Sequence, residues 1–288
     1  MPDGNIPEIE SEKPVNEPYK PDLGIKYPPN PDDHMVEFKP LYNTVVDENY
    51  PFLEKTFSFR FMRGLMHLGI FTLVFSLSPI IYGIKTEGKK LLRKHRKLFK
   101  NGAMTVSNHI HRWDFLFVLL AVRYRFMYFP VWKEQLNGKD RDLIRLAGGI
   151  PIPAELSTIK YFNQAFDEIH AKKKWFHAFP ESSRFDYFWP IRPFKKGVFT
   201  MAYKYGLPVI PMAFSYRKAE FPLTIINSFR ALRGKHRLPG ITLRIGDPLV
   251  FDEGLGRKEA VIKMRKDCHE AVVRLAGITE NSYPAEGD

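Results

Sequence analysis

GAMTVSNHIHRWDFLFVLLAV, residues 102–122, is the stretch on which the fold of this chain depends. Residues 102–107 are small or apolar and predict a short strand, and the apolar run over residues 114–122 predicts a helix. The loop between them therefore joins the carboxyl end of a strand to the start of a helix. Functional residues of α/β folds commonly gather at this place.

The loop contains a histidine and a carboxylate with four residues between them, His109 and Asp114. A carboxylate that accepts a hydrogen bond from one ring nitrogen leaves the other nitrogen free to act as a general base. The pair is thus the minimum equipment for removing a proton from a hydroxyl group. The same spacing also arises by chance, with His109 capping a helix and Asp114 solvated in its first turn. His111, between the two, is interpreted as a loop residue without a catalytic role.

The rest of the chain alternates short apolar runs with longer helical stretches. This alternation predicts an α/β fold, a mixed sheet flanked by helices. Further strands are expected at 126–131, 149–152, 175–179, 209–214 and 241–245, and further helices at 157–172, 195–205 and 258–275.

The charge of the chain is distributed unevenly. The whole sequence has a net charge of +12, but residues 1–50 hold 4 basic and 11 acidic residues. This region also carries nine of the 23 prolines, and a tenth follows at Pro51, so residues 1–56 are predicted to be an extended, disordered tail. The strongly basic remainder suits anionic lipid headgroups, a nucleotide-bearing acyl donor, an acidic carrier protein or nucleic acid. A single cysteine, Cys268, excludes an internal disulfide framework.

An apolar segment follows the acidic region. Residues 64–84 carry no formal charge and are followed by a cluster of lysines and arginines over residues 85–97. The length is near that of a helix that spans a bilayer, about 20 residues. An interfacial helical hairpin bent at Ser78-Pro79 would bury the same surface. Residues 57–88 are therefore predicted to associate with a membrane, and residues 89–288 to form the main domain, on the cytoplasmic face of the cell membrane by the positive-inside tendency.

Three further blocks follow the His-x4-Asp loop in order. They are Gly148-Gly149-Ile150-Pro151-Ile152-Pro153, then Phe179-Pro180-Glu181-Ser182-Ser183-Arg184, then Leu207-Pro208-Val209-Ile210-Pro211. With Asn108-His109 and Asp114, their order and spacing resemble the glycerolipid acyltransferases typified by 1-acylglycerol-3-phosphate acyltransferase, over roughly residues 90 to 250. The resemblance implies the glycerol-3-phosphate acyltransferase-like α/β fold.

The resemblance implies roles for individual residues. His109 is the general base that takes the proton of the acceptor hydroxyl, and Asp114 orients it. The third block, Glu181 to Arg184, holds the acceptor, with Arg184 the first choice for contact with an anion. Lys195 adds positive charge to the same site. Gly149, Ile150 and Pro151 of the second block complete the predicted substrate-binding set.

Two positions depart from the pattern of the family. Ser182-Ser183 replaces Gly-Thr, which keeps a hydroxyl at 183 and loses a glycine at 182. Pro153 stands where many members have an arginine that contacts a phosphate-bearing acceptor. The proline at position 153 is compatible with acyl transfer, but it leaves open which lipid is the acceptor.

The resemblance therefore implies transfer of a fatty acyl group from acyl-CoA or acyl-carrier protein to a lysoglycerolipid hydroxyl, with 1-acylglycerol-3-phosphate the first candidate. Another lysolipid or an amino-acid-containing lipid is the alternative acceptor. The alternative from another class is a catalytically idle module that binds membranes or nucleic acid, which would have no need of His109 and Asp114. No metal or tightly bound cofactor is expected, since no cysteine pair and no third ligand accompany the two histidines. The expected partners are membrane lipids and the acyl donor, without nucleic acid; the oligomeric state stays open.

Overall fold

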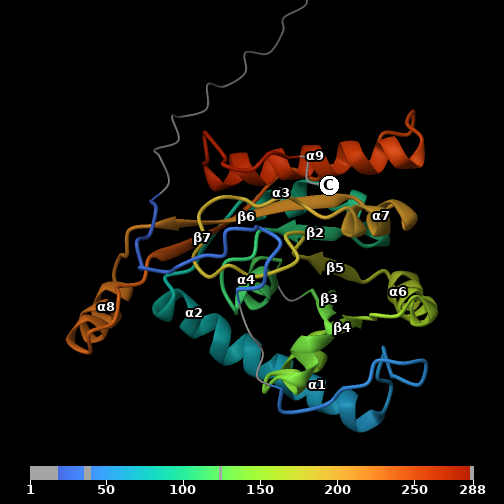
Figure 1. The fold of residues 1–288 in the computed structure, drawn as a ribbon, viewed down its shortest axis with the longest axis horizontal. Coiled ribbons are helices and arrows are strands. Elements are labelled where there is room, and N and C mark those ends of the chain that lie inside the picture. Colours follow the sequence, from blue (N-terminus) through green and yellow to red (C-terminus); the bar gives the residue numbers. More distant parts are fainter. Residues whose placement is uncertain (1–18, 36–39, 123–124, 286–288) are drawn as a thin grey trace, which may run out of the picture.

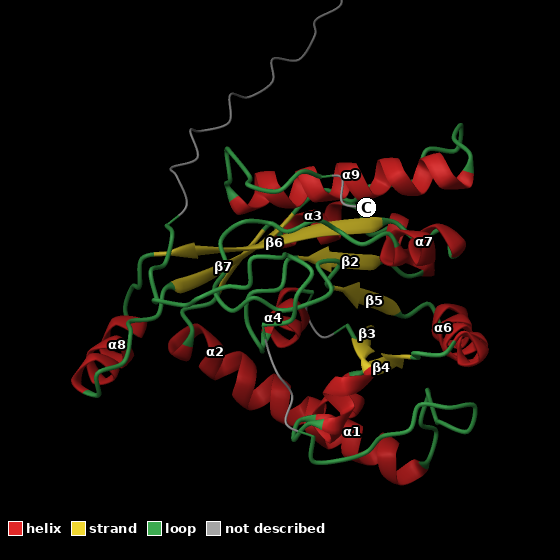
Figure 2. Ribbon diagram, in the orientation of Figure 1, coloured by secondary structure: helices red, strands yellow, loops and turns green. Residues whose placement is uncertain are grey.

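The computed structural model describes residues 19–35, 40–122 and 125–285. Seven strands form one sheet in the order β1-β7-β6-β2-β5-β3-β4. Neighbouring strands are parallel except β6 and β7, which are antiparallel. The predicted mixed α/β sheet is confirmed (Figure 2). The strands are β1 (Lys85–Glu87), β2 (Met104–Ser107), β3 (Met127–Trp132), β4 (Gly149–Ile152), β5 (Trp175–Ala178), β6 (Val209–Arg217) and β7 (Gly240–Ile245).

Helices cover both faces of the sheet (Figure 1). They are α1 (Phe57–Gly69), α2 (Phe75–Ile81), α3 (Lys89–Lys94), α4 (Asp114–Ala121), α5 (Arg141–Ala147), α6 (Ile159–Ala171), α7 (Gly197–Lys204), α8 (Leu223–Leu232) and α9 (Arg257–Ala276). Short 3₁₀ turns lie at Leu98–Asn101, Lys133–Asn137 and Leu156–Thr158. Helix α9 packs on β6 and β7, and α4 packs on the opposite face (Figure 1).

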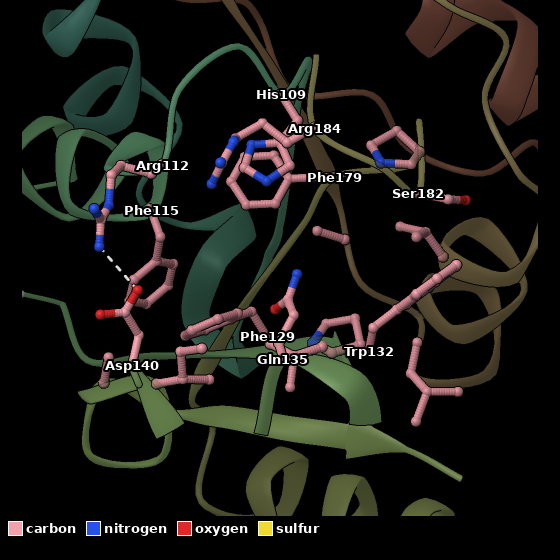
Figure 3. Close-up of a pocket in the computed structure, with 18 of the residues that line it drawn as sticks. His109, Arg112, Phe115, Phe129, Trp132, Gln135, Asp140, Phe179, Ser182 and Arg184 are labelled. Carbon is pink, nitrogen blue, oxygen red and sulfur yellow. Dashed lines mark hydrogen bonds and ion pairs between the residues drawn. The ribbon is translucent and has the colours of Figure 1, made fainter. Parts of the chain in front are cut away.

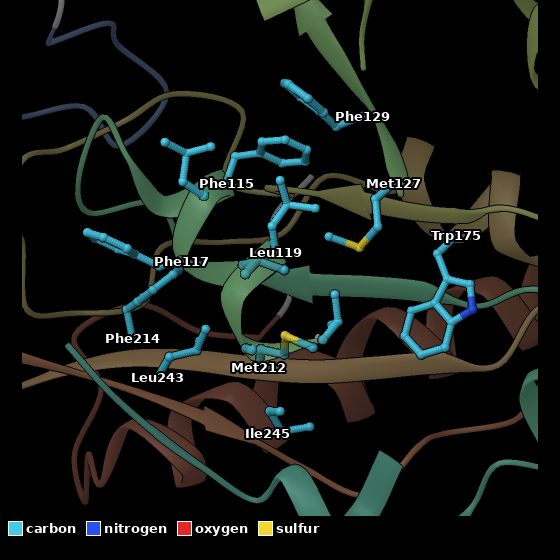
Figure 4. Close-up of a cluster of buried hydrophobic side chains, with 14 of the residues drawn as sticks. Phe115, Phe117, Leu119, Met127, Phe129, Trp175, Met212, Phe214, Leu243 and Ile245 are labelled. Carbon is cyan, nitrogen blue, oxygen red and sulfur yellow. The ribbon is translucent and has the colours of Figure 1, made fainter. Parts of the chain in front are cut away.

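The central strands are buried on both faces because helices cover both sides of the sheet. Every residue of β2 is buried, and so are the first eight residues of β6. Phe117 of α4 packs with Phe214 of β6 and Leu243 of β7 in the core cluster on the α4 side (Figure 4). The second cluster joins the sheet to α6, α7 and α9. These two cores hold the end of β2 at a constant position relative to α4.

All the strands and helices predicted from the alternation are present, with ends shifted by a few residues. The structure adds β1, α3, α5 and α8, which the sequence did not predict. Strand β1 is only three residues long and pairs with β7, more than 150 positions away. Such a short strand has no periodicity of its own to detect.

The apolar segment forms one continuous helix, Phe57–Ile81, in which a π-helical turn at Ile70–Val74 joins α1 to α2. By length and composition alone it could cross a membrane. Ser78 and Pro79 both lie inside α2, so the alternative of a hairpin bent at these residues is not what the structure contains. The helix packs lengthwise on the domain, since Ile70, Phe75 and Ser78 are buried against it.

The acidic segment differs from its prediction. Residues 19–35 and 40–56 have no helix or strand, in keeping with an extended conformation, but they pack on the domain. Tyr27 stacks on Phe185 and donates a hydrogen bond to the carbonyl of Asp186, while Thr44 binds Asn137. Residues 1–18, also part of the predicted tail, lie outside the described residues. The expected disorder therefore does not hold for the described part, because aromatic and backbone groups there find partners far along the chain.

Candidate active site

The loop after β2 is attached to the neighbouring strand through Asn108. Its side-chain amide donates to the carbonyl of Phe214 at 3.0 Å and its oxygen accepts from the Phe214 N–H at 2.8 Å. Asn108 is 1% exposed, so both bonds are shielded from water. This two-point connection to β6 holds the start of the loop and hence the backbone of the next residue, His109.

The structure brings His109 and Asp114 together. The distance from His109 Nδ1 to Asp114 Oδ2 is 2.9 Å. The same carboxylate oxygen accepts the backbone N–H groups of Ile110 at 2.7 Å and His111 at 2.8 Å. Asp114 is fully buried at the first turn of α4, whereas 15% of the His109 side chain is exposed. The carboxylate therefore closes the loop and orients the imidazole.

These contacts determine the tautomer of His109. Asp114 Oδ2 accepts two backbone N–H groups, which identifies it as a hydrogen-bond acceptor. The proton of its contact with His109 therefore belongs to Nδ1, and the second ring nitrogen, Nε2, is left with a lone pair. Burial lowers the pKa of His109 well below its usual value, and the cationic side chains of Arg184 and Arg192 lower it further. Burial also acts on Asp114, whose pKa it raises against the effect of the backbone donors. The imidazole is thus neutral and able to accept a proton at Nε2.

His109 lies on the wall of a cavity of about 850 Å³ (Figure 3). The ring stacks on Phe179 with a centroid distance of 3.9 Å. Below it the wall is mainly apolar, with contributions from strands β3, β4 and β5 and helices α4, α5, α6 and α7: Phe115, Leu116, Phe129, Val131, Trp132, Ile144, Ile152, Phe162, Phe176 and Met201. Cationic side chains also line the cavity: Arg112, Lys139, Arg184 and Lys195. A hydroxyl acceptor with an apolar chain and an anionic group has matching surfaces here.

Arg184, Ser182 and Lys195 from the predicted substrate-binding set line this cavity. Arg184 lies beside His109 (Figure 3), and its Nε is 2.7 Å from Asp186 Oδ1. Lys195 Nζ is 2.7 Å from the carboxylate of Asp32, in the acidic N-terminal segment. Ser182 has a φ of +67°, a left-handed conformation that glycine adopts at lower cost than serine.

Two other members of the predicted set, Glu181 and Ser183, do not line the cavity. Both make hydrogen bonds to other residues of the protein. Glu181 is 3% exposed; its Oε2 accepts the backbone N–H of His109 at 2.9 Å and lies 3.3 Å from Arg192 Nη2. Ser183 donates to the carbonyl of Asp33 at 3.0 Å and accepts from Arg192 Nη1 at 2.7 Å. Burial raises the pKa of Glu181, and the Arg192 cation opposes this shift. Both residues therefore support the loop.

Gly149, Ile150 and Pro151 also lie away from the cavity wall. They belong to β4, the edge strand, and are buried. A Cβ on Gly149 would lie 2.5 Å from a side-chain carbon of Ile144, so the glycine permits close packing of β4 on α5. The second block therefore places Ile152, the next residue of the strand, on the cavity wall.

Arg192 was not predicted and is 1% exposed. It binds Glu181, the side chain and the carbonyl of Ser183, and the carbonyl of Pro31. Arg192 lies between two prolines in Pro190-Ile191-Arg192-Pro193, but no sequence pattern indicates that it binds Glu181 and Ser183. Asn108 precedes His109 in the Asn-His motif, but no local sequence pattern indicates its connection to Phe214.

His111 is buried by aromatic rings. Its ring centroid is 5.0 Å from that of Tyr82, and its Nδ1 accepts the Trp113 N–H at 3.2 Å. Burial lowers the pKa of His111 to about 3. Among the described residues, no group of three or more histidine, cysteine, aspartate or glutamate side chains could hold a metal ion.

The chain is similar to a known protein family and to solved structures. The model of the acyltransferase family matches residues 83–215. The chain is also similar to the crystal structure of the 1-acyl-sn-glycerophosphate (LPA) acyltransferase PlsC from Thermotoga maritima, with 19% sequence identity, a TM-score of 0.49, and coverage of 78% of this chain and 84% of that chain. None of the curated proteins matches the sequence.

Proposed function

We propose that this chain, whose residues 83–215 match the acyltransferase family, is an acyltransferase that transfers a fatty acyl group from a thioester to the free hydroxyl of a lysoglycerolipid. The observation that carries this proposal is the hydrogen bond from His109 Nδ1 to Asp114 at 2.9 Å, on the wall of an apolar cavity of about 850 Å³ with cationic side chains. The donor is acyl-CoA or acyl-carrier protein, and the first candidate acceptor is 1-acylglycerol-3-phosphate, which gives phosphatidic acid.

The proposed reaction has one base and no acyl-enzyme. His109 Nε2 accepts the proton of the acceptor hydroxyl as its oxygen attacks the thioester carbonyl carbon. Asp114 stabilises the imidazolium that forms. When the tetrahedral intermediate collapses, the carbon–sulfur bond breaks, the ester remains, and the thiolate takes the proton back from His109. The burial that lowers the pKa of His109 favours this return.

Two cationic side chains support an acceptor that carries a phosphate. Arg184 and Lys195 line the cavity of which His109 is part, and an arginine can meet two phosphate oxygens with its planar fork. Pro153 offers no such contact. Lys139, also on the wall, is a further cation that could take the place of the missing arginine.

We also propose that the enzyme works at the cytoplasmic face of the cell membrane, with helix 57–81 lying in the plane of the bilayer. Support comes from its lengthwise packing on the domain and from its exposed apolar side chains, among them Phe57, Leu68 and Leu73. A helix held along a domain in this way can immerse its outer face without crossing the bilayer. The lysine and arginine cluster at 85–97 supports the cytoplasmic side.

The test is thioester consumption by the purified protein in liposomes, with acyl-CoA or acyl-carrier protein as donor. The acceptors are 1-acylglycerol-3-phosphate and lysophosphatidylcholine. We expect turnover with the first, and a loss of about a thousandfold or more in kcat for His109→Ala. His95→Ala is the matched control, because His95 pairs with Asp247 on the surface and should retain activity.

This test distinguishes an error in the proposed acceptor from an error in the proposed mechanism. Turnover with lysophosphatidylcholine alone would keep the reaction and replace the acceptor, in line with Pro153. Full activity of His109→Ala would contradict the general-base mechanism.

A further inference from the structure

Helix α8 packs on the domain through one face. Leu223 and Asn227, one helical turn apart, are both buried. Asn227 donates to the carbonyl of Leu238 and accepts the N–H of the same residue, each at 2.8 Å. These bonds fold residues 233–238 back along the helix and hold it rigidly, so its other side has a constant orientation.

That other side is apolar and exposed. Phe221 is 79% exposed, Phe229 61% and Leu232 84%, and Ile225 between them is 48% exposed. Isolated exposed apolar residues are common, but four on one short helix and its entry turn form a continuous patch. A patch of this kind indicates contact with another apolar phase or molecule.

The charge around this patch has one sign. Residues 221–246 contain no aspartate or glutamate, and the turn after α8 presents Arg233, Lys235 and Arg237. All three are exposed, and within the described ranges none forms an ion pair. The adjacent carboxylate, Glu220, is neutralised by Lys85 at 2.6 Å. We call Phe221, Ile225, Phe229 and Leu232, together with Arg233, Lys235 and Arg237, the α8 surface.

The α8 surface adjoins the exposed face of the long helix. Helix α8 packs against α2, and both lie on the side of the molecule away from α9 (Figures 1 and 2). The outward residues of helix 57–81 near this contact are also apolar, including Leu77, Ile80 and Ile81. The two helices therefore contribute to one apolar face, with arginine and lysine at its α8 end.

We propose that the α8 surface is a second membrane contact, which inserts its apolar side chains between the headgroups of an anionic bilayer and binds their phosphates through Arg233, Lys235 and Arg237. An anionic bilayer fits both halves of the surface, because it offers an apolar interior directly beneath negative charge. Neither half takes part in acyl transfer, so the inference stands apart from the proposed reaction. It assigns to α8 the function of fixing how the cavity faces the bilayer.

The first test measures contact of single positions with lipid in the full chain. Cys268 is buried and burial raises the pKa of its thiol, so a dye added under native conditions reacts with an introduced, exposed cysteine. A fluorescent label at Leu232→Cys is compared with labels at Leu68→Cys on α1 and Ile262→Cys on α9. The probe is a vesicle of phosphatidylcholine and phosphatidylglycerol that carries nitroxide-labelled lipid as quencher.

We expect quenching at 232 and at 68 and none at 262, because α9 lies on the opposite face of the sheet (Figure 1). Quenching at 68 without quenching at 232 would overturn the proposal, and so would its absence at both. An emission shift at 232 that grows with protein concentration and does not respond to the lipid quencher would assign the surface to a second copy of the chain, which also overturns it.

The second test separates local charge from net charge. Arg233→Gln with Lys235→Gln should reduce partition onto vesicles containing phosphatidylglycerol by about tenfold or more, and should have little effect with phosphatidylcholine alone. The matched control, Arg257→Gln with Lys258→Gln at the start of α9, removes the same charge from exposed positions on the far side. Equal losses from both pairs would contradict a specific contact at α8.

Discussion

At the level of single residues, one carboxylate oxygen of Asp114 accepts hydrogen bonds from three donors within the His-x4-Asp loop. Two of these are backbone N–H groups and the third is His109 Nδ1. A neighbouring cation then acts on the same histidine: Arg184 lowers the pKa of His109 by charge repulsion, after burial. Asp114 thus orients His109, the proposed base, and Arg184 lowers its pKa; these three residues lie within 76 positions of the chain.

This arrangement predicts the pH dependence of kcat/KM. The base form of His109 exists above its pKa, and that pKa is lowered, so the acid limb should lie below about 6.5, the ordinary value for histidine. Arg184→Gln removes one lowering charge and should move the limb to higher pH. A pH series on both proteins measures this, with Arg112→Gln, whose partner is Asp140, as the comparison. An unchanged limb in Arg184→Gln would contradict the electrostatic effect.

Ser182 leads to a prediction about stability. Its φ of +67° is costly for a residue with a Cβ, by about 1 kcal/mol. Ser182→Gly should therefore raise the free energy of unfolding by up to about that amount, measured by urea denaturation. Ser157→Gly is the comparison, because φ at Ser157 is not positive: glycine there adds freedom to the unfolded chain and removes the exposed hydrogen bond to Glu155, so it should lower the stability. A lower free energy of unfolding in Ser182→Gly would show that a contact of the serine side chain stabilises the protein by more than the positive φ costs.

At the level of elements, the loop that joins β5 to α7 is held by the buried pair of Glu181 and Arg192. The pair lies 3.3 Å apart with both side chains nearly inaccessible, and it links the loop to the backbone of His109. A buried ion pair adds little over an apolar pair, but loss of one partner leaves a charge without compensation. The position of His109, the proposed general base, therefore depends on a buried pair that contributes no atom to the proposed reaction.

We expect Arg192→Met and Glu181→Gln each to lower the free energy of unfolding, the first by about 3–5 kcal/mol because it leaves a buried carboxylate unpaired. The double variant should cost less than the sum of the two. Chemical denaturation of the four proteins in a double-mutant cycle measures the coupling. Additive losses would mean that the two side chains do not act as a pair.

At the level of the whole molecule, the acidic N-terminal segment lies against the active-site loop. Pro31 and Asp33 offer carbonyl oxygens to Arg192 and Ser183, and Asp32 pairs with Lys195 on the cavity wall. The segment thus contacts the active-site loop and pairs with Lys195, a cation that we propose for a phosphate-bearing acceptor. Its composition alone indicated only an extended polar chain.

Asp32→Asn should free Lys195 and lower KM for 1-acylglycerol-3-phosphate by about two- to fivefold, the size expected of an exposed ion pair. KM for an uncharged monoacylglycerol should not change. Asp33→Asn is the matched control, since the contact that Asp33 makes with the loop uses its backbone carbonyl. Identical KM values for wild type and Asp32→Asn would indicate that Lys195 does not contact the acceptor.

The sequence alone determined the strands and the helices with clear periodicity, the long apolar helix and the residues of the His-x4-Asp loop, because all of these depend on neighbours within a few positions. The tertiary structure decided what those residues touch. Glu181 and Ser183 turned from predicted substrate contacts into supports of the loop once Arg192 had come into reach, and the described part of the acidic segment packs where disorder was predicted. Arg192 meets Pro31 across 161 positions and Asn108 meets Phe214 across 106. Contacts at such separations depend on how the whole chain packs, and no local pattern of residue types encodes them.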